Sequence, residues 1–211
     1  MDRSGSTQRE ERVTGTPVLR EPGRALTVED VVSAYEIFMA MATPEGPPSG
    51  VRIHEPLATF LAMEVVGRRR LDDLLATIER EHLQPVYHGD FWVGNILRRA
   101  SDGRLVLIDR ERHAFGSRKL DGADFLLDFV LNERGRAFPA FDLRSFCGHF
   151  GIAPVDRDLL EATILRQVLW YSPTGRAYPL LFTHLEMLKR LCSSGRLPAS
   201  LEAGLTRSGL A

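Results

Sequence analysis

Two short stretches decide the fold of this chain: VYHGDFWVGNIL at residues 86–97 and RLVLID at residues 104–109. Between them lies the Asp-Gly pair of residues 102–103, which is a strong signal for a tight hairpin turn. The apolar run inside the second stretch is too short for a helix and rich in branched residues, which is typical of a buried strand. The sequence therefore predicts a β-hairpin with an outgoing strand at residues 96–99 and a returning strand at residues 104–108.

Three side chains with oxygen atoms are expected at the open end of this hairpin. A hairpin places its two open ends side by side, so Asn95 and Asp109 should be neighbours, and Asp90 lies five residues before Asn95 across a loop that contains Gly94. Magnesium usually takes one or two carboxylates from a protein and its other ligands from water and substrate phosphates. Asn95 and Asp109 fit that number, and Asp90 is left over as a base.

The spacing of these residues resembles the catalytic loop of the aminoglycoside phosphotransferase family, a protein-kinase-like group. The family pattern is H-G-D-x-x-x-x-N, then an apolar strand, then I-D-x-E, then a glycine seven residues after that aspartate and another aspartate five residues later. The chain has the first motif at residues 88–95. The later positions are filled by Asp109, Glu111, Gly116 and Asp121. The resemblance covers about residues 86–125.

The resemblance implies an ATP- and magnesium-dependent phosphotransferase that acts on the hydroxyl of a small molecule. In such enzymes the catalytic-loop aspartate accepts the hydroxyl proton, and an asparagine and a later aspartate hold the metal against the phosphates of ATP. Asp90 would then be the catalytic base, and Asn95 and Asp109 would bind Mg²⁺ and, through it, ATP. Structural support would come from His88, which orients the loop, and from Glu111 and Asp121.

The implied fold class is α+β and mostly α-helical: a protein-kinase-like C-terminal lobe with a small catalytic β-hairpin and without the N-terminal sheet lobe. Of the 27 basic residues only Lys119 and Lys189 are lysines, and both follow the catalytic-loop motif. No lysine is therefore available upstream to pair with the α- and β-phosphates, and arginine is not a geometric substitute for it. The expected organisation is a disordered or extended arm at residues 1–24, the kinase-like lobe at residues 25–205 and a tail at residues 206–211.

Helical patterns fill most of the remaining sequence. Thr27 begins a capping-box-like start with a stripe of apolar residues that predicts a helix to about Ala42. A long helical pattern covers residues 55–81, and the arginines at residues 68–70 interrupt its apolar surface, as a solvated turn between two helices would. Further helices are expected at residues 125–133, at residues 141–150, after an Asp156 cap and at residues 178–192.

Composition excludes several classes of partner. With 211 residues, 44% hydrophobic residues and a net charge of −1, the chain is typical of a soluble globular protein with no bulk electrostatic attraction to nucleic acid. No apolar run reaches the roughly 20 residues that a membrane-spanning helix needs. Cys147 and Cys192 have no metal-ligand spacing and fit a reducing cytoplasm, the expected location.

Three alternatives remain at the level of sequence. The chain can be a truncated phosphotransferase whose missing lobe comes from elsewhere. It can be a non-catalytic kinase-like lobe that binds a small molecule, or a protein partner that covers an exposed upper face. It can also be a gene product without a selected activity.

Overall fold

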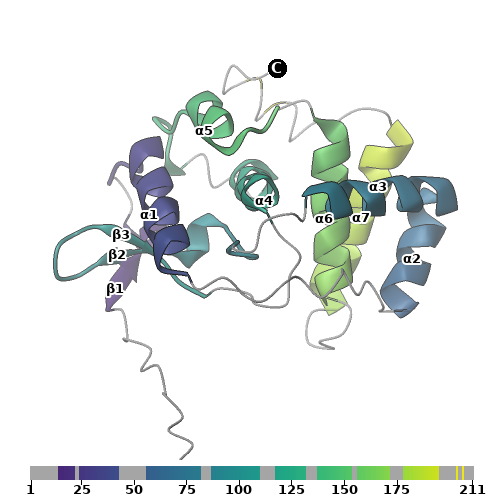
Figure 1. The fold of residues 1–211 in the computed structure, drawn as a ribbon, viewed down its shortest axis with the longest axis horizontal. Coiled ribbons are helices and arrows are strands. Elements are labelled where there is room, and N and C mark those ends of the chain that lie inside the picture. The colour runs from purple at the N-terminus through teal and green to yellow at the C-terminus, as the bar shows by residue number, and fades with distance from the viewer. Residues whose placement is uncertain are drawn as a thin grey trace, which may run out of the picture.

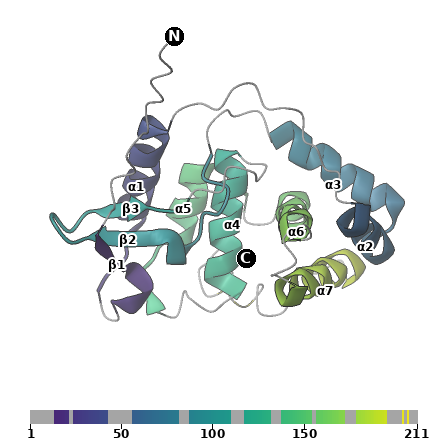
Figure 2. The ribbon, with the colours of Figure 1, turned by 90° about the horizontal axis from the view of Figure 1, so that it is seen from below.

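The chain folds as an α+β protein that is mostly helical, with one small antiparallel sheet (Figure 1). This computed structural model describes residues 14–21, 24–42, 56–81, 87–109, 117–131, 137–153, 156–171 and 178–194, together with Ala203 and Thr206. Helix α4 lies between the sheet with α1 on one side and the helices α2, α3, α6 and α7 on the other in both views (Figures 1 and 2).

The predicted hairpin is confirmed. Strand β2 is Ile96–Arg99, with the predicted bounds. Strand β3 is Leu105–Leu107, one residue shorter at each end than predicted. The two strands pair antiparallel with Ile96 opposite Leu107. The turn closes where the Arg99 N–H donates to the Arg104 carbonyl at 2.8 Å, so the Asp-Gly pair lies where the sequence placed it.

A third strand adds to the outer edge of β2. Strand β1, Gly15–Pro17, pairs antiparallel with β2, and Pro17 can stand there because an edge strand needs hydrogen bonds on one side only. It lies in the segment expected to be a disordered or extended arm. The short 3₁₀ helix η1, Val18–Arg20, follows and buries Val18 in the core. Glu21 then accepts a hydrogen bond from Arg98 Nε at 2.8 Å, which ties this segment to the hairpin.

Helix α1, Val28–Met41, begins as the sequence predicts, because the Thr27 hydroxyl accepts from the Asp30 N–H at 3.1 Å. The long helical pattern is two helices, α2 (Pro56–Val66) and α3 (Arg68–Glu81). The prediction of a turn at the three arginines is wrong by a short distance. The break falls on Gly67, whose φ of 78° few other residues adopt, and the arginines form the first turn of α3.

The remaining helices are α4 (Arg118–Leu131), α5 (Leu143–Phe150), α6 (Arg157–Tyr171) and α7 (Tyr178–Ser194). Helix α4 begins seven residues earlier than expected, so Asp121 stands in its first turn and not in a loop. Helix α5 begins two residues later than expected and ends at Phe150, as predicted, and Gly151 follows it in the left-handed conformation. The predicted Asp156 cap is also present, because its carboxylate accepts from the Leu159 N–H at 3.0 Å.

One hydrophobic core joins the described elements from η1 to α7. Its aromatic part brings α4 and α5 against the loop before β2: Phe125 lies 4.6 Å from Phe146 and 5.1 Å from Phe91 between ring centroids. Phe91 is fully buried and also contacts Tyr35 of α1 at 5.0 Å. Such aromatic pairs add about 0.5–1.5 kcal/mol each beyond the area they bury. The loop therefore rests on a packed floor.

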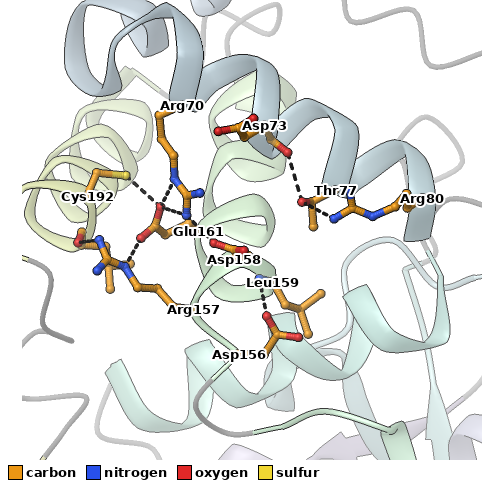
Figure 3. Close-up of polar contacts among 11 residues, drawn as sticks. Arg70, Asp73, Thr77, Arg80, Asp156, Arg157, Asp158, Leu159, Glu161 and Cys192 are labelled. Carbon is orange, nitrogen blue, oxygen red and sulfur yellow. Dashed lines mark hydrogen bonds and ion pairs between the residues drawn. The ribbon is translucent and has the colours of Figure 1, made fainter.

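A buried carboxylate joins α3, α6 and α7 at the other side of the molecule (Figure 3). Glu161 is fully buried and accepts from both Arg70 nitrogens Nε and Nη2, at 2.9 and 2.7 Å, and from Arg157 Nε at 2.5 Å. The Cys192 thiol donates to the same carboxylate at 3.0 Å, and burial, followed by Glu161, raises the pKa of this thiol to about 12. Two guanidinium groups thus compensate the negative charge of Glu161. Without such partners, burying an ionised carboxylate would cost a large amount of free energy.

Among the helices that the structure describes, none combines the length and the apolar surface that crossing a membrane requires.

Candidate functional site

The backbone of the loop before β2 is held by the carboxylate of Asp121. One Asp121 oxygen, Oδ2, accepts from the His88 N–H at 2.7 Å, and the other, Oδ1, accepts from the Gly89 N–H at 2.9 Å. Gly89 has a φ of 86°, in the left-handed region that favours glycine. Because Asp121 is fully buried in α4, the loop is fixed to the helix that lies between the sheet and α6 (Figures 1 and 2).

Tyr35 of α1 contacts the same carboxylate. Its hydroxyl donates to Asp121 Oδ2 at 2.7 Å, and the whole side chain is buried. Burial, and then the Asp121 charge, raise the pKa of Tyr35 far above its ordinary value, so the phenol stays protonated and remains a donor. The carboxylate therefore joins three parts of the chain: α1, the loop and α4.

Replacing Tyr35 with phenylalanine should lower the free energy of unfolding by about 1.5–3 kcal/mol, because a buried hydrogen bond to a charged acceptor is lost while the ring is kept. Urea denaturation followed by circular dichroism measures this. An unchanged m-value would show that the compactness of the native state is kept. A loss below about 0.5 kcal/mol would contradict a stabilising contact between Tyr35 and Asp121.

His88 connects the loop with the end of β3. Its Nε2 donates to the Ile108 carbonyl at 2.9 Å, and its fully buried ring lies 4.9 Å from the ring of Phe38. The Ile108 N–H in turn donates to the Asn95 carbonyl at 3.0 Å. The N–H and the carbonyl of Ile108, the residue before Asp109, are thus both tied to the loop, and this keeps the backbone of Asp109 close to Asn95.

Asp90 is half-buried and its carboxylate is oriented by two donors. Asn95 Nδ2 donates to Asp90 Oδ2 at 2.8 Å, and Trp92 Nε1 donates to the same oxygen at 3.2 Å. Asn95 Nδ2 also bonds the Asp90 carbonyl at 2.9 Å, which closes the loop on itself. Gly94 is required here because a Cβ at this position would lie 2.1 Å from the Trp92 ring. Both side-chain donors therefore bind the same oxygen, Oδ2.

Asp109 is exposed and has a φ of 64°, the only positive φ on a non-glycine residue among those described. An L-residue in this region costs roughly 1–2 kcal/mol, although aspartate tolerates it better than most. Residues held in such backbone conformations cluster at active sites, ligand clamps and switch regions.

The chemistry of the donors fits magnesium. Asn95 uses its amide nitrogen for Asp90, so its amide oxygen is the atom that would serve a cation, together with the Asp109 carboxylate. Over the described ranges no three histidine, cysteine, aspartate or glutamate side chains gather as a metal-binding group. The predicted Glu111 and Gly116 lie outside the described residues.

Sequence reasoning missed two residues of this site, Tyr35 and Arg166. Arg166 of α6 is 1% exposed, and its Nη1 lies 3.5 Å from the Gly89 carbonyl. The apolar stripe of α6 contains a signal that could have found it, because Arg166 stands seven residues after the buried Leu159. The two lysines lie elsewhere: Lys119 pairs with Glu81 at 3.3 Å, and Lys189 is exposed on α7.

No family model, curated protein or solved structure that we compared with this chain matches it.

Proposed function

We propose that this chain is a cytoplasmic, ATP- and magnesium-dependent phosphotransferase that acts on the hydroxyl of a small molecule and is similar to the aminoglycoside phosphotransferases. The observation that carries the proposal is the oriented carboxylate of Asp90. It stands at the open end of a hairpin, next to the amide of Asn95, in a loop whose backbone is fixed by buried groups. Phosphoryl transfer depends mostly on such positioning and on charge stabilisation.

In this proposal Asp90 accepts the proton of the attacking hydroxyl, and Asn95 and Asp109 would hold Mg²⁺. The metal would neutralise charge on the phosphates of ATP. His88 and Asp121 do no chemistry. They hold the two backbone segments from which Asp90 and Asp109 project.

A titration of the full chain with ATP tests the site. Isothermal calorimetry with Mg²⁺ present should show binding that EDTA abolishes, and the Asp109→Asn variant should bind at least about tenfold more weakly, since a carboxylate ligand is lost. The matched control is Asp102→Asn, which removes the same charge from the turn at the opposite end of the same hairpin. Equal binding by the two variants would contradict a metal site at Asp109.

Asp109→Gly should separate stability from activity. Glycine adopts a φ of 64° without strain, so the free energy of unfolding should stay unchanged or rise by up to about 1 kcal/mol. Magnesium-dependent ATP turnover should nevertheless be lost. Denaturation and turnover measured on one preparation check both parts, and a destabilisation above about 1 kcal/mol would show that the Asp109 side chain stabilises the fold.

The second candidate is a non-catalytic kinase-like lobe that binds a protein partner. It is favoured by apolar side chains on one side of α1, where Ile37 and Met41 are one turn apart and 39% and 74% exposed. A partner covering this side would bury them. Replacing both with serine should then abolish co-sedimentation with a partner while leaving ATP binding unchanged, whereas the phosphotransferase proposal requires turnover by the chain.

A further inference from the structure

Helix α6 carries a buried arginine in the middle of the molecule. The Arg166 side chain is 1% exposed, and its guanidinium forms an ion pair with Asp124 of α4, which is itself 6% exposed. The other Asp124 oxygen accepts from Gln167 Nε2 at 3.0 Å. Taking both charges out of water costs several kcal/mol per ion, and a pair of this kind can often be replaced by apolar residues without loss of stability. Stability alone is therefore a poor explanation for Arg166.

The contacts of Arg166 point to the loop. Its Nη1 lies 3.5 Å from the carbonyl oxygen of Gly89, whose N–H is held by Asp121 at 2.9 Å. The two peptide groups of Gly89 are thus held from two different helices, α4 and α6. Glycine has more conformational freedom than any other residue, and Gly89 lies in the left-handed region, so these two contacts restrict the backbone conformation of the loop at this position.

The Gly89 carbonyl belongs to the peptide group that leads into Asp90. Fixing this group fixes the direction in which the Asp90 side chain leaves the backbone. The guanidinium charge also interacts with the carboxylates of Asp121 and Asp90, and burial lowers the pKa of Arg166 while these charges oppose that change. Arginine remains protonated at any pH a protein tolerates, so this is a permanent positive charge beneath the loop.

We propose that Arg166 is a positioning residue: anchored by Asp124, it holds the Gly89 carbonyl and so sets the orientation of Asp90. The inference rests on the proposed phosphotransfer for its kinetic part, and its structural part is independent of any activity. Misplacing a reacting group by about 1 Å can reduce a rate about a hundredfold, so a residue that does no chemistry can still limit kcat.

The experiment compares three variants of the full chain. Arg166→Met leaves Asp124 buried without its cation and should lower the denaturation midpoint. The double variant Asp124→Asn with Arg166→Met removes both charges and should bring the midpoint back towards wild type, but it cannot restore the contact with Gly89. The control is Val168→Ala, a cavity on α6 in the separate cluster with Leu185, which should lower the midpoint and leave the loop unchanged.

Two readouts then decide the role. The amide of Gly89 should exchange its hydrogen at least about tenfold faster in the double variant than in Val168→Ala, because the opposite side of the residue is no longer held. Magnesium-dependent transfer should show kcat at least about tenfold lower in the double variant, with KM within about threefold of wild type.

The failures of the two proposals can be told apart. Wild-type protein without magnesium-dependent transfer would overturn the proposed function, and Gly89 exchange would still decide whether Arg166 holds the loop. Wild-type exchange and wild-type kcat in the double variant would overturn the positioning role. Slow exchange with a kcat reduced equally in Val168→Ala would do the same, because the loss would then follow general destabilisation.

Discussion

Replacing Asp121 of α4 with asparagine should lower the free energy of unfolding by about 3–5 kcal/mol, the largest effect on stability that we expect of any single change at the site. The carboxylate accepts from the Tyr35 hydroxyl and from the N–H groups of His88 and Gly89. An asparagine has one acceptor oxygen, and its amide nitrogen would face a donor. At least one buried donor would be left unsatisfied, and the remaining bonds would lose their charge.

Chemical denaturation monitored by circular dichroism measures this loss. Asp30→Asn is the matched control, because Asp30 and Asp121 are both acidic residues in the first turn of a helix, and Asp30 is exposed. Any effect of the helix dipole, about 0.3–1 kcal/mol, appears in both variants. A loss in Asp121→Asn no greater than in Asp30→Asn would show that the three hydrogen bonds do not stabilise the loop.

Asp90→Asn should reduce magnesium-dependent phosphate transfer by about 10²–10⁴-fold, the usual contribution of general base catalysis, while the free energy of unfolding changes by less than about 1 kcal/mol. The amide keeps the shape of the carboxylate and can still accept the hydrogen bonds of Asn95 and Trp92 at its oxygen. What it cannot do is take up the proton of a hydroxyl.

Transfer of the labelled γ-phosphate of ATP, to water and to a panel of hydroxyl compounds, measures the effect. Asp102→Asn again serves as the control for a lost charge on the hairpin. Full transfer by Asp90→Asn would show that another group is the base. Wild-type protein that transfers nothing, with ATP bound or not, would leave the partner-binding lobe as the better account.

The hairpin could be predicted because local sequence determines it. Elements that depend on tertiary contacts or on backbone conformation could not be predicted. The Asp-Gly turn and the four-residue apolar run are sufficient to predict β2 and β3. Thr27 likewise caps α1 through a local hydrogen bond, which it accepts from the N–H three residues later. Strand β1 has no such signal, because Gly15–Pro17 is three residues long, does not alternate and is a strand only through its pairing with β2. Three arginines looked more like a helix boundary than Gly67, whose backbone conformation is what ends α2.

The candidate site divides in the same way. His88, Asp90 and Asn95 lie within eight residues, so their spacing was sufficient to place them in one loop. Tyr35 stands 86 residues before Asp121, whose carboxylate it contacts, and Arg166 stands 77 residues after Gly89 of the loop. In the sequence Tyr35 reads as one more apolar position of a stripe, and only the fold shows that its hydroxyl meets Asp121.

Asp121 binds both α1 and the loop, so the stability of α1 in its place and the stability of the loop conformation are thermodynamically coupled. A ligand that tightens the loop must also retard the opening of α1, and it should slow proteolytic cleavage within residues 28–41. Linkage works in both directions. A molecule that separates α1 from Asp121 would weaken ligand binding at Asp90 by the same factor by which the ligand weakens the binding of that molecule. Helix α1, which carries none of the proposed reacting groups, would then regulate ligand binding at the loop.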